Sequence, residues 1–146
     1  MNAVPRRAVL ALPMIAAAPS ARAEEESFAA AERAILAGRA PRADGVLLDI
    51  PTLSENGNSV DVAIRVDSPM TAEDHVTAIH ILAERNPVPR VASFQLTARA
   101  GRAEVATRIR LATTQTILVL AETSRGAVHR ATHEVIVILG ACVEAG

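Results

Sequence analysis

The sequence predicts an all-β protein: an immunoglobulin-like β-sandwich of about seven strands, with a helix before it and a short arm after it. Apolar and polar residues alternate with a period of two in several segments, as expected for strands buried on one face. Turn-forming Gly, Pro, Asn and Ser residues separate these segments at short intervals. Strand-like and helix-like segments do not alternate along the chain, which argues against a parallel α/β sheet.

The sandwich is expected to occupy residues 45–139. The clearest strand covers 60–67, in which apolar side chains alternate with polar or small ones, and Ser68-Pro69 ends it. The segment from Ser54 to Asn58 before it predicts a turn, because Asn56-Gly57 is the strongest short hairpin signal. The other predicted strands are 46–50, 75–84, 91–97, 103–111, 116–121 and 128–139.

Segment 75–84 is apolar on both faces, so a helix competes with a strand there. Its Val, Thr and Ile residues and the closing Asn86-Pro87 pair favour a strand. Segment 116–121 is continuously apolar, which suits a central strand.

Residues 24–44 are expected to form an N-terminal helix and a linker. The helix is predicted at 25–37, with Ser27 as a plausible N-cap and Gly38 as its stop. Phe28, Ala31 and Ile35 lie along one face of that helix. Segment 39–44, which contains Pro41, follows as the linker.

Residues 1–23 have the pattern of an export signal peptide of the twin-arginine type. Arg6 and Arg7 precede the apolar run 8–18, which is too short to span a bilayer. Ala21-Arg22-Ala23 fits a small-x-small cleavage site. The mature chain would then be periplasmic, with 123 residues, 12 of them basic and 16 acidic.

Composition argues against several kinds of partner. The chain has two Phe and no Trp or Tyr, so it lacks the usual means of stacking on nucleic-acid bases. The acidic balance of the mature chain also disfavours nucleic acid and anionic membranes as partners.

No metal or cofactor site is predicted. His129 and His133 would lie roughly 13 Å apart along one strand, too far to bind one ion together. His75 and His80 fall on opposite faces of their predicted strand. Two interpretations of Arg108 and Arg110, which share a face with Glu104, remain: a charged outer sheet face, or an anion-binding or docking patch.

Cys142 is the one cysteine of the chain, and in an exported protein an odd cysteine indicates a reactive thiol, a bond to another chain, or chance. It lies beyond the last periodic residue, Leu139, and follows Gly140 and Ala141. These small neighbours predict a thin, mobile segment over 140–146 rather than a core position. A mobile thiol at a chain end is suited to presenting a covalent load to another protein.

Several motifs together resemble the SoxY family of bacterial sulfur-oxidation carrier proteins. They cover nearly the whole mature chain: Glu55-Asn56-Gly57-Asn58-Ser59-Val60, Val66-Asp67-Ser68-Pro69-Met70, Asn86-Pro87, Val91-Ala92-Ser93-Phe94 and the segment 103–112. Gly140-Ala141-Cys142 stands where that family has its terminal Gly-Gly-Cys-Gly-Gly arm.

The resemblance implies a sandwich with an N-terminal helix, and a SoxZ-like partner that forms a heterodimer. It implies that Cys142 is conjugated to thiosulfate by a haem protein, and that separate hydrolase and dehydrogenase enzymes process the bound sulfur. The carrier itself would be no enzyme and would need no cofactor.

The tail departs from the family pattern. Ala141 and Val143 stiffen the backbone relative to Gly, and Glu144 adds negative charge near the sulfur. This tail resembles a SoxY-related subgroup that ends in Ala-Ala-Cys-Ile-Glu. Two functions therefore stay open: a covalent sulfur carrier, or a non-catalytic binding or scaffold subunit with altered or lost thiol chemistry.

Overall fold

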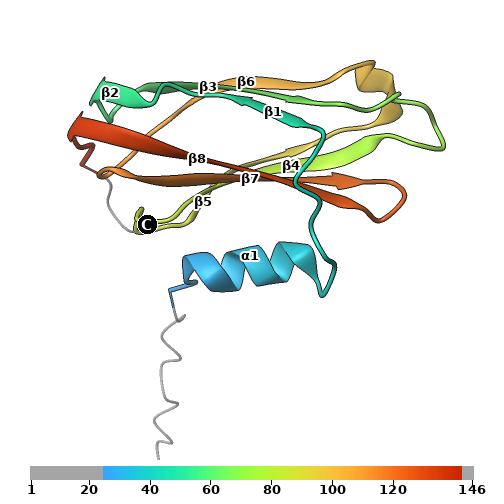
Figure 1. The fold of residues 1–146 in the computed structure, drawn as a ribbon, viewed down its shortest axis with the longest axis horizontal. Helices are drawn as coiled ribbons and strands as arrows, with labels where there is room; N and C mark the ends of the chain where they lie inside the picture. Colours follow the sequence, from blue (N-terminus) through green and yellow to red (C-terminus); the bar gives the residue numbers. More distant parts are fainter. Residues whose placement is uncertain (1–24, 143–146) are drawn as a thin grey trace, which may run out of the picture.

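Residues 25–142 are described by the computed structural model, whose fold is shown in Figure 1. Two β-sheets lie face to face, and helix α1 (Phe28–Leu36) lies beneath the larger one. The predicted export segment 1–23 and the arm residues Val143 and Glu144 fall outside the described residues. Within the described range, no helix is long and apolar enough to cross a bilayer.

The two sheets are built almost entirely from antiparallel strand pairs, and they confirm the predicted sandwich. The smaller sheet has the order β1-β3-β6, from β1 (Val46–Asp49), β3 (Val60–Val66) and β6 (Ala103–Ile109). The larger sheet has the order β2-β8-β7-β4-β5, from β2 (Leu53–Asn56), β8 (Val128–Leu139), β7 (Gln115–Thr123), β4 (Val76–Ala83) and β5 (Arg90–Gln95). A 3₁₀ turn, η1 (Ala98–Ala100), precedes β6.

Strand β3 shows why the period-two pattern predicts this fold. Its four apolar residues are at most 4% exposed, whereas Asp61, Ala63 and Arg65 between them are exposed. The buried side chains meet those of the larger sheet in one apolar core between the layers. Alternation along β3 therefore places one face in the core and the other in solvent.

Strands β4 and β7 are buried on both faces because the sheet core lies on one side and α1 on the other. Ile79, Ile81 and Ala83 of β4 face the core between the sheets, while Leu82 packs with α1. The strand alternative for 75–84 is therefore the right one. A register shift between Val76 and Ala78 turns Val76 towards the core, on the same side as Ile79 rather than with Ala78 as simple alternation predicts.

Helix α1 is shorter than the predicted 25–37. Ser27 caps it as expected, accepting a hydrogen bond from the Ala30 backbone N–H at 3.2 Å. The helix ends before Gly38, because Ala37 already adopts the left-handed conformation with φ 48°. Its buried Ala31 and Ile35 pack on the outer face of the larger sheet.

The turn predicted at Ser54 to Asn58 is wrong in its extent and its type. Residues 53–56 form β2, an eighth strand, which pairs in parallel with β8 in the larger sheet. A type I′ Asn-Gly hairpin needs positive φ, and Gly57 is not among the residues with positive φ. The chain therefore leaves the smaller sheet after β1, forms β2 in the larger sheet and returns to the smaller sheet as β3. Strands β1 and β3 pair with each other although β2 lies between them in the sequence.

Candidate functional site: the cysteine arm

Cys142 lies just beyond the last anchored residue of the sandwich. Its side chain is exposed and its thiol is free. The residue before it, Ala141, is only 8% exposed. The thiol is therefore displayed directly at the body of the protein. Strands β2 and β8 end side by side (Figure 1), and Cys142 comes three residues after the end of β8.

The segment that leads to Cys142 is held by backbone hydrogen bonds. Gly57 N–H donates to the Leu139 carbonyl at 2.8 Å, and Ala141 N–H donates to the Leu111 carbonyl at 2.9 Å. Leu111 N–H in turn donates to the Gly57 carbonyl at 2.8 Å, so Gly57 and Leu111 are hydrogen-bonded to each other as well as to the segment 139–141. The prediction of a thin segment without a core position over 140–146 is thus wrong for Ala141, which is buried and hydrogen-bonded to Leu111.

Two glycines make this close approach possible. A Cβ atom added at Gly140 would lie 2.1 Å from the Ala112 carbonyl oxygen. A Cβ added at Gly57 would lie 2.3 Å from the Leu111 carbonyl oxygen. Both glycines are therefore needed for space rather than for an unusual φ.

An apolar surface surrounds the end of β8 beside the arm. Leu53 of β2 pairs in register with Ile136 of β8, and Ile138 follows two residues later on the same face. These side chains are 54%, 43% and 67% exposed, and Leu139 at the strand end is 64% exposed. We call Leu53, Ile136 and Ile138 the β2–β8 apolar surface.

The four histidines make separate hydrogen bonds, and no group of three or more metal-ligating side chains occurs among residues 25–142. The His129 Nδ1–H donates to the Asp44 carbonyl at 2.9 Å, and His133 Nε2 contacts Thr52 Oγ1 at 3.1 Å. The His75 Nδ1–H donates to the Thr71 carbonyl at 3.0 Å.

The fourth histidine, His80, belongs to a polar row that sequence reasoning missed. Ser93 Oγ lies 2.8 Å from His80 Nδ1, and His80 Nε2 lies 2.8 Å from Glu122 Oε1. Arg39 binds the other oxygen of that carboxylate at 2.6 Å and also donates to the Ile35 and Leu36 carbonyls at the end of α1. The row therefore ties the end of α1 to three strands of the larger sheet.

This row also sets the ionisation of Glu122. Burial by itself would raise the pKa of the carboxyl, but hydrogen bonds from Arg39 and His80 outweigh it and lower that pKa. The carboxylate accepts from His80 Nε2–H, since a carboxylate oxygen has no proton to donate, and Ser93 Oγ completes the bonding of the ring at Nδ1. The sequence signal for this row was a histidine inside the otherwise apolar run 78–83.

The arginines of the smaller sheet pair with neighbouring carboxylates. Arg108 binds Asp61 at 2.8 Å, and Arg65 binds Glu104 at 2.9 Å. Arg110 lies beyond β6, so it does not extend that row. These pairs favour the interpretation as a charged outer sheet face over an anion-binding patch.

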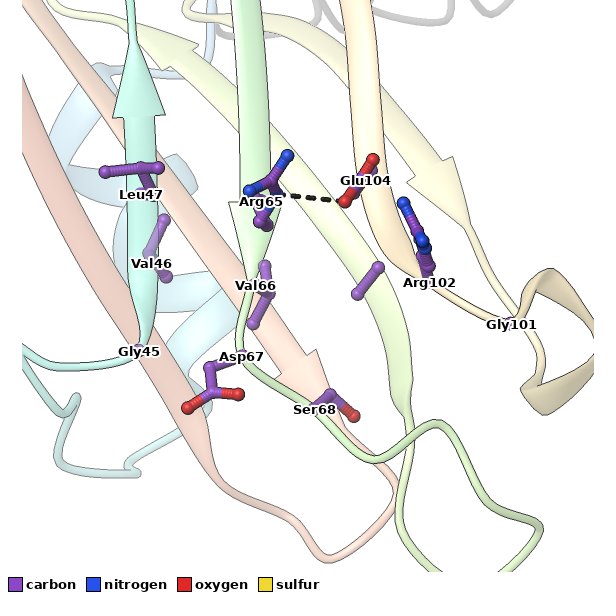
Figure 2. Close-up of a pocket in the computed structure, with 11 residues that line it drawn as sticks. Gly45, Val46, Leu47, Arg65, Val66, Asp67, Ser68, Gly101, Arg102 and Glu104 are labelled. Carbon is purple, nitrogen blue, oxygen red and sulfur yellow. Dashed lines mark ion pairs between the residues drawn. The ribbon is translucent and has the colours of Figure 1, made fainter.

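A hollow of about 700 Å³ lies at the Val66 end of β3, the end opposite to the one that follows Gly57. Figure 2 shows the residues that line it. Arg65 and Glu104 pair across it, and Asp67 and Arg102 also line it. Because acidic and basic side chains are both present, the hollow favours no charged ligand of one sign.

Comparison with known proteins extends the similarity to the whole sandwich. The model of the family described as "Sulfur oxidation protein SoxY" matches residues 32–142, so the match ends on Cys142. The sulfur carrier protein SoxY from Chlorobium limicola f thiosulfatophilum is 31% identical, with a TM-score of 0.61. That alignment covers 76% of this chain and 98% of the other.

Two superoxide reductases share the fold alone. The neelaredoxin from Ignicoccus hospitalis is 13% identical, with a TM-score of 0.57 over 64% of this chain and 80% of its own. The protein from Nanoarchaeum equitans is 10% identical, with a TM-score of 0.55 over 66% of this chain and 100% of its own. No curated protein sequence matches the chain.

The family match accounts for the observed architecture. It spans part of α1, the eight strands of residues 25–142 and the anchored segment before the thiol. The family consists of sulfur carriers rather than catalysts, which agrees with the expectation of a non-enzymatic subunit. The chain belongs to the SoxY family of sulfur oxidation proteins.

Proposed function

We propose that this protein is an exported carrier that holds sulfur intermediates covalently on Cys142 for separate sulfur-oxidation enzymes. The observation that carries the proposal is the position of the thiol. It is the one cysteine of the chain, it is exposed, and the family match ends on it. A cysteine kept in the core would instead be shielded from partner proteins.

The chemistry needs an accessible sulfur and a separate oxidant. With thiosulfate as cargo, the thiol and thiosulfate form one S–S bond and release one proton and two electrons to a haem protein. The product is a cysteine S-thiosulfonate, whose outer sulfur is then processed by other enzymes. Cys142 supplies the nucleophilic sulfur, and activation of its thiolate comes from the loading enzyme.

The rest of the arm would guide recognition. Gly140 and Ala141 form its root, while Val143 and Glu144 follow the thiol and would contact the wall and rim of a partner's pocket. A carboxylate at position 144 disfavours an anionic cargo, so a basic pocket rim is the expected complement.

We further propose a SoxZ-like subunit as a stable heterodimer partner. The β2–β8 apolar surface supports this, because exposed apolar groups of this kind are typical of protein interfaces. A stable complex of this type buries about 1,200 to 2,000 Å². Co-expression with a neighbouring SoxZ-like gene product should give one co-eluting species, and a monomer indifferent to that partner would refute the pairing.

Export through the twin-arginine route completes the proposal, with cleavage after Ala23 and a periplasmic mature chain. The mass of the native protein in fractionated cells tests it. A periplasmic species that begins at Glu24 is expected, and a full-length cytoplasmic species would contradict export.

The decisive experiment on function is mass spectrometry of the protein from cells grown on reduced sulfur compounds, before and after a reductant. A reductant-labile sulfur adduct on Cys142 is expected. Cys142→Ser should abolish sulfur-dependent growth while the purified variant unfolds at the wild-type temperature. A thiol that is always free, together with normal growth of the variant, would instead support a scaffold subunit.

A further inference from the structure

The loop between β6 and β7 is the surface on which the arm root rests. Leu111 accepts the hydrogen bond from Ala141 N–H, and the Ala112 carbonyl faces Gly140. Thr114 adds a side-chain link, since its Oγ1 accepts from Val137 N–H at 2.9 Å near the end of β8. The position from which Cys142 leaves the sandwich therefore depends on the shape of loop 110–114.

Two side-chain amides hold that loop. Asn86 Oδ1 accepts from Ala112 N–H at 3.0 Å, and Asn86 Nδ2 donates to the Arg110 carbonyl at 2.8 Å. These bonds grip the loop on both sides of Leu111, the residue that anchors Ala141. Asn86 itself lies after β4, so it joins a distant turn to the root of the arm.

Gln115 holds the side-chain amide of Asn86 by a hydrogen bond. Its side chain is only 2% exposed, and its Nε2 donates to Asn86 Oδ1 at 2.9 Å and to the Thr113 carbonyl at 3.0 Å. Its Oε1 accepts from Arg85 N–H at 2.8 Å. A buried amide with its donors and its acceptor satisfied has one favoured orientation, and it orients Asn86 in turn.

We propose that Asn86 and Gln115 are positioning residues that set where and at what angle Cys142 leaves the sandwich. The proposal rests on the proposed function, because the position matters only if another protein must reach the thiol. Neither residue is proposed to touch the sulfur. Their effect passes through loop 110–114 to Ala141, and from there along one peptide bond to Cys142.

The test follows the Ala141 amide by hydrogen exchange in the folded, full mature chain. Asn86→Ala should accelerate exchange of that amide at least ten-fold relative to the Leu120 amide in the centre of β7. Gln115→Met, which keeps the side-chain length and removes the amide, should do the same. Because both act through one loop, the double variant should add less than the two single effects combined.

The control is Ile35→Val, which lowers stability in the α1 cluster and has no bond to the loop or the arm. It should leave the ratio of Ala141 to Leu120 exchange at its wild-type value. An unchanged ratio in both amide variants, while they remain folded, would overturn the proposal. So would strictly additive effects, since these would mean that the two amides act independently.

A second readout uses the thiol. Alkylation of Cys142 by iodoacetamide should change less than two-fold in Asn86→Ala, because the thiol is already exposed. Alkylation by a 5-kDa maleimide polymer should quicken several-fold, because release of the root moves the thiol away from the body. Equal changes with both reagents would contradict positioning.

These outcomes are separate from those of the proposed function. A thiol that carries no sulfur in cells removes the carrier role but leaves the exchange ratios as they are. Unchanged exchange ratios remove the positioning role even if Cys142 is loaded with sulfur.

Discussion

Replacement of Gly140 by Ala tests the anchored arm root most directly. The new Cβ would lie 2.1 Å from the Ala112 carbonyl oxygen, well inside contact distance, so something must move. One backbone hydrogen bond holds Ala141, whereas the side chains of Asn86 and Gln115 bind loop 110–114 at several points, so the segment after Leu139 can move away more easily than the loop can. We therefore expect the root to detach while the sandwich stays folded.

The magnitude follows from what detachment removes. The Ala141 N–H loses its hydrogen bond to Leu111, which contributes about 1 kcal/mol. The buried Ala141 methyl becomes exposed, which costs about 0.8 kcal/mol. On detachment the backbone at position 140 regains conformational freedom in the folded protein, which offsets about 1 kcal/mol of this loss. The free energy of unfolding should thus fall by about 1 kcal/mol.

The assay combines urea unfolding with exchange of the Ala141 amide. Gly126→Ala is the matched control, since Gly126 has open space around it but a φ of 82°, which costs an L-residue about 1–2 kcal/mol. Both variants should lose similar stability, and only Gly140→Ala should lose protection at Ala141. Wild-type protection at Ala141 in Gly140→Ala would refute the close-approach argument.

Three further results are expected. Glu122→Gln should destabilise the protein most above pH 4.5, the ordinary pKa of that carboxyl, because the lowered folded-state pKa gives stability that is lost as pH falls through it; urea unfolding from pH 7 to pH 3 checks this, and a constant difference over that range would contradict it. Ile35→Ala, at a side chain 7% exposed, should lower the free energy of unfolding by about 2–3 kcal/mol and should accelerate amide exchange in α1 more than in β7. Hydrogen exchange followed by mass spectrometry measures this, and equal acceleration in α1 and β7 would argue against a helix that docks independently. Ile138→Asp should change the free energy of unfolding by less than about 0.5 kcal/mol, because Ile138 is exposed, and should weaken binding of a SoxZ-like partner in size-exclusion chromatography. Val88→Asp, at another exposed position, is the control, and unchanged binding in Ile138→Asp would mean that the β2–β8 apolar surface is not part of the interface.

The local pattern of apolar and polar residues predicts most strands of the fold. The predicted strand 128–139 has the observed limits of β8, and the predicted strand 60–67 exceeds β3 by one residue. This agreement is expected because one-sided burial imposes a period of two on the sequence. The cap at Ser27 is also predictable, since a cap hydrogen bond spans only three residues. The position of Cys142 after the last strand follows from the same pattern.

Contacts between distant segments are not predictable in this way. The sequence predicts a turn where β2 lies, because the partner that makes it a strand, β8, is about 80 residues away. The row from Ser93 through His80 to Glu122 depends on the registers of three strands, which no local pattern reveals. Only the outline of that row, a polar residue in an apolar strand, is visible in the sequence.

For the arm, the sequence determined which atom is available, and the tertiary structure decided how it is held. One cysteine after the final strand can be identified from the order of residues, because strand periodicity ends at Leu139. The anchoring of Gly140 and Ala141 depends on Gly57, Asn86 and loop 110–114, which meet only when both sheets are formed. Small residues permit a mobile segment and a tightly packed one equally well, and backbone hydrogen bonds from distant parts of the chain select the packed one.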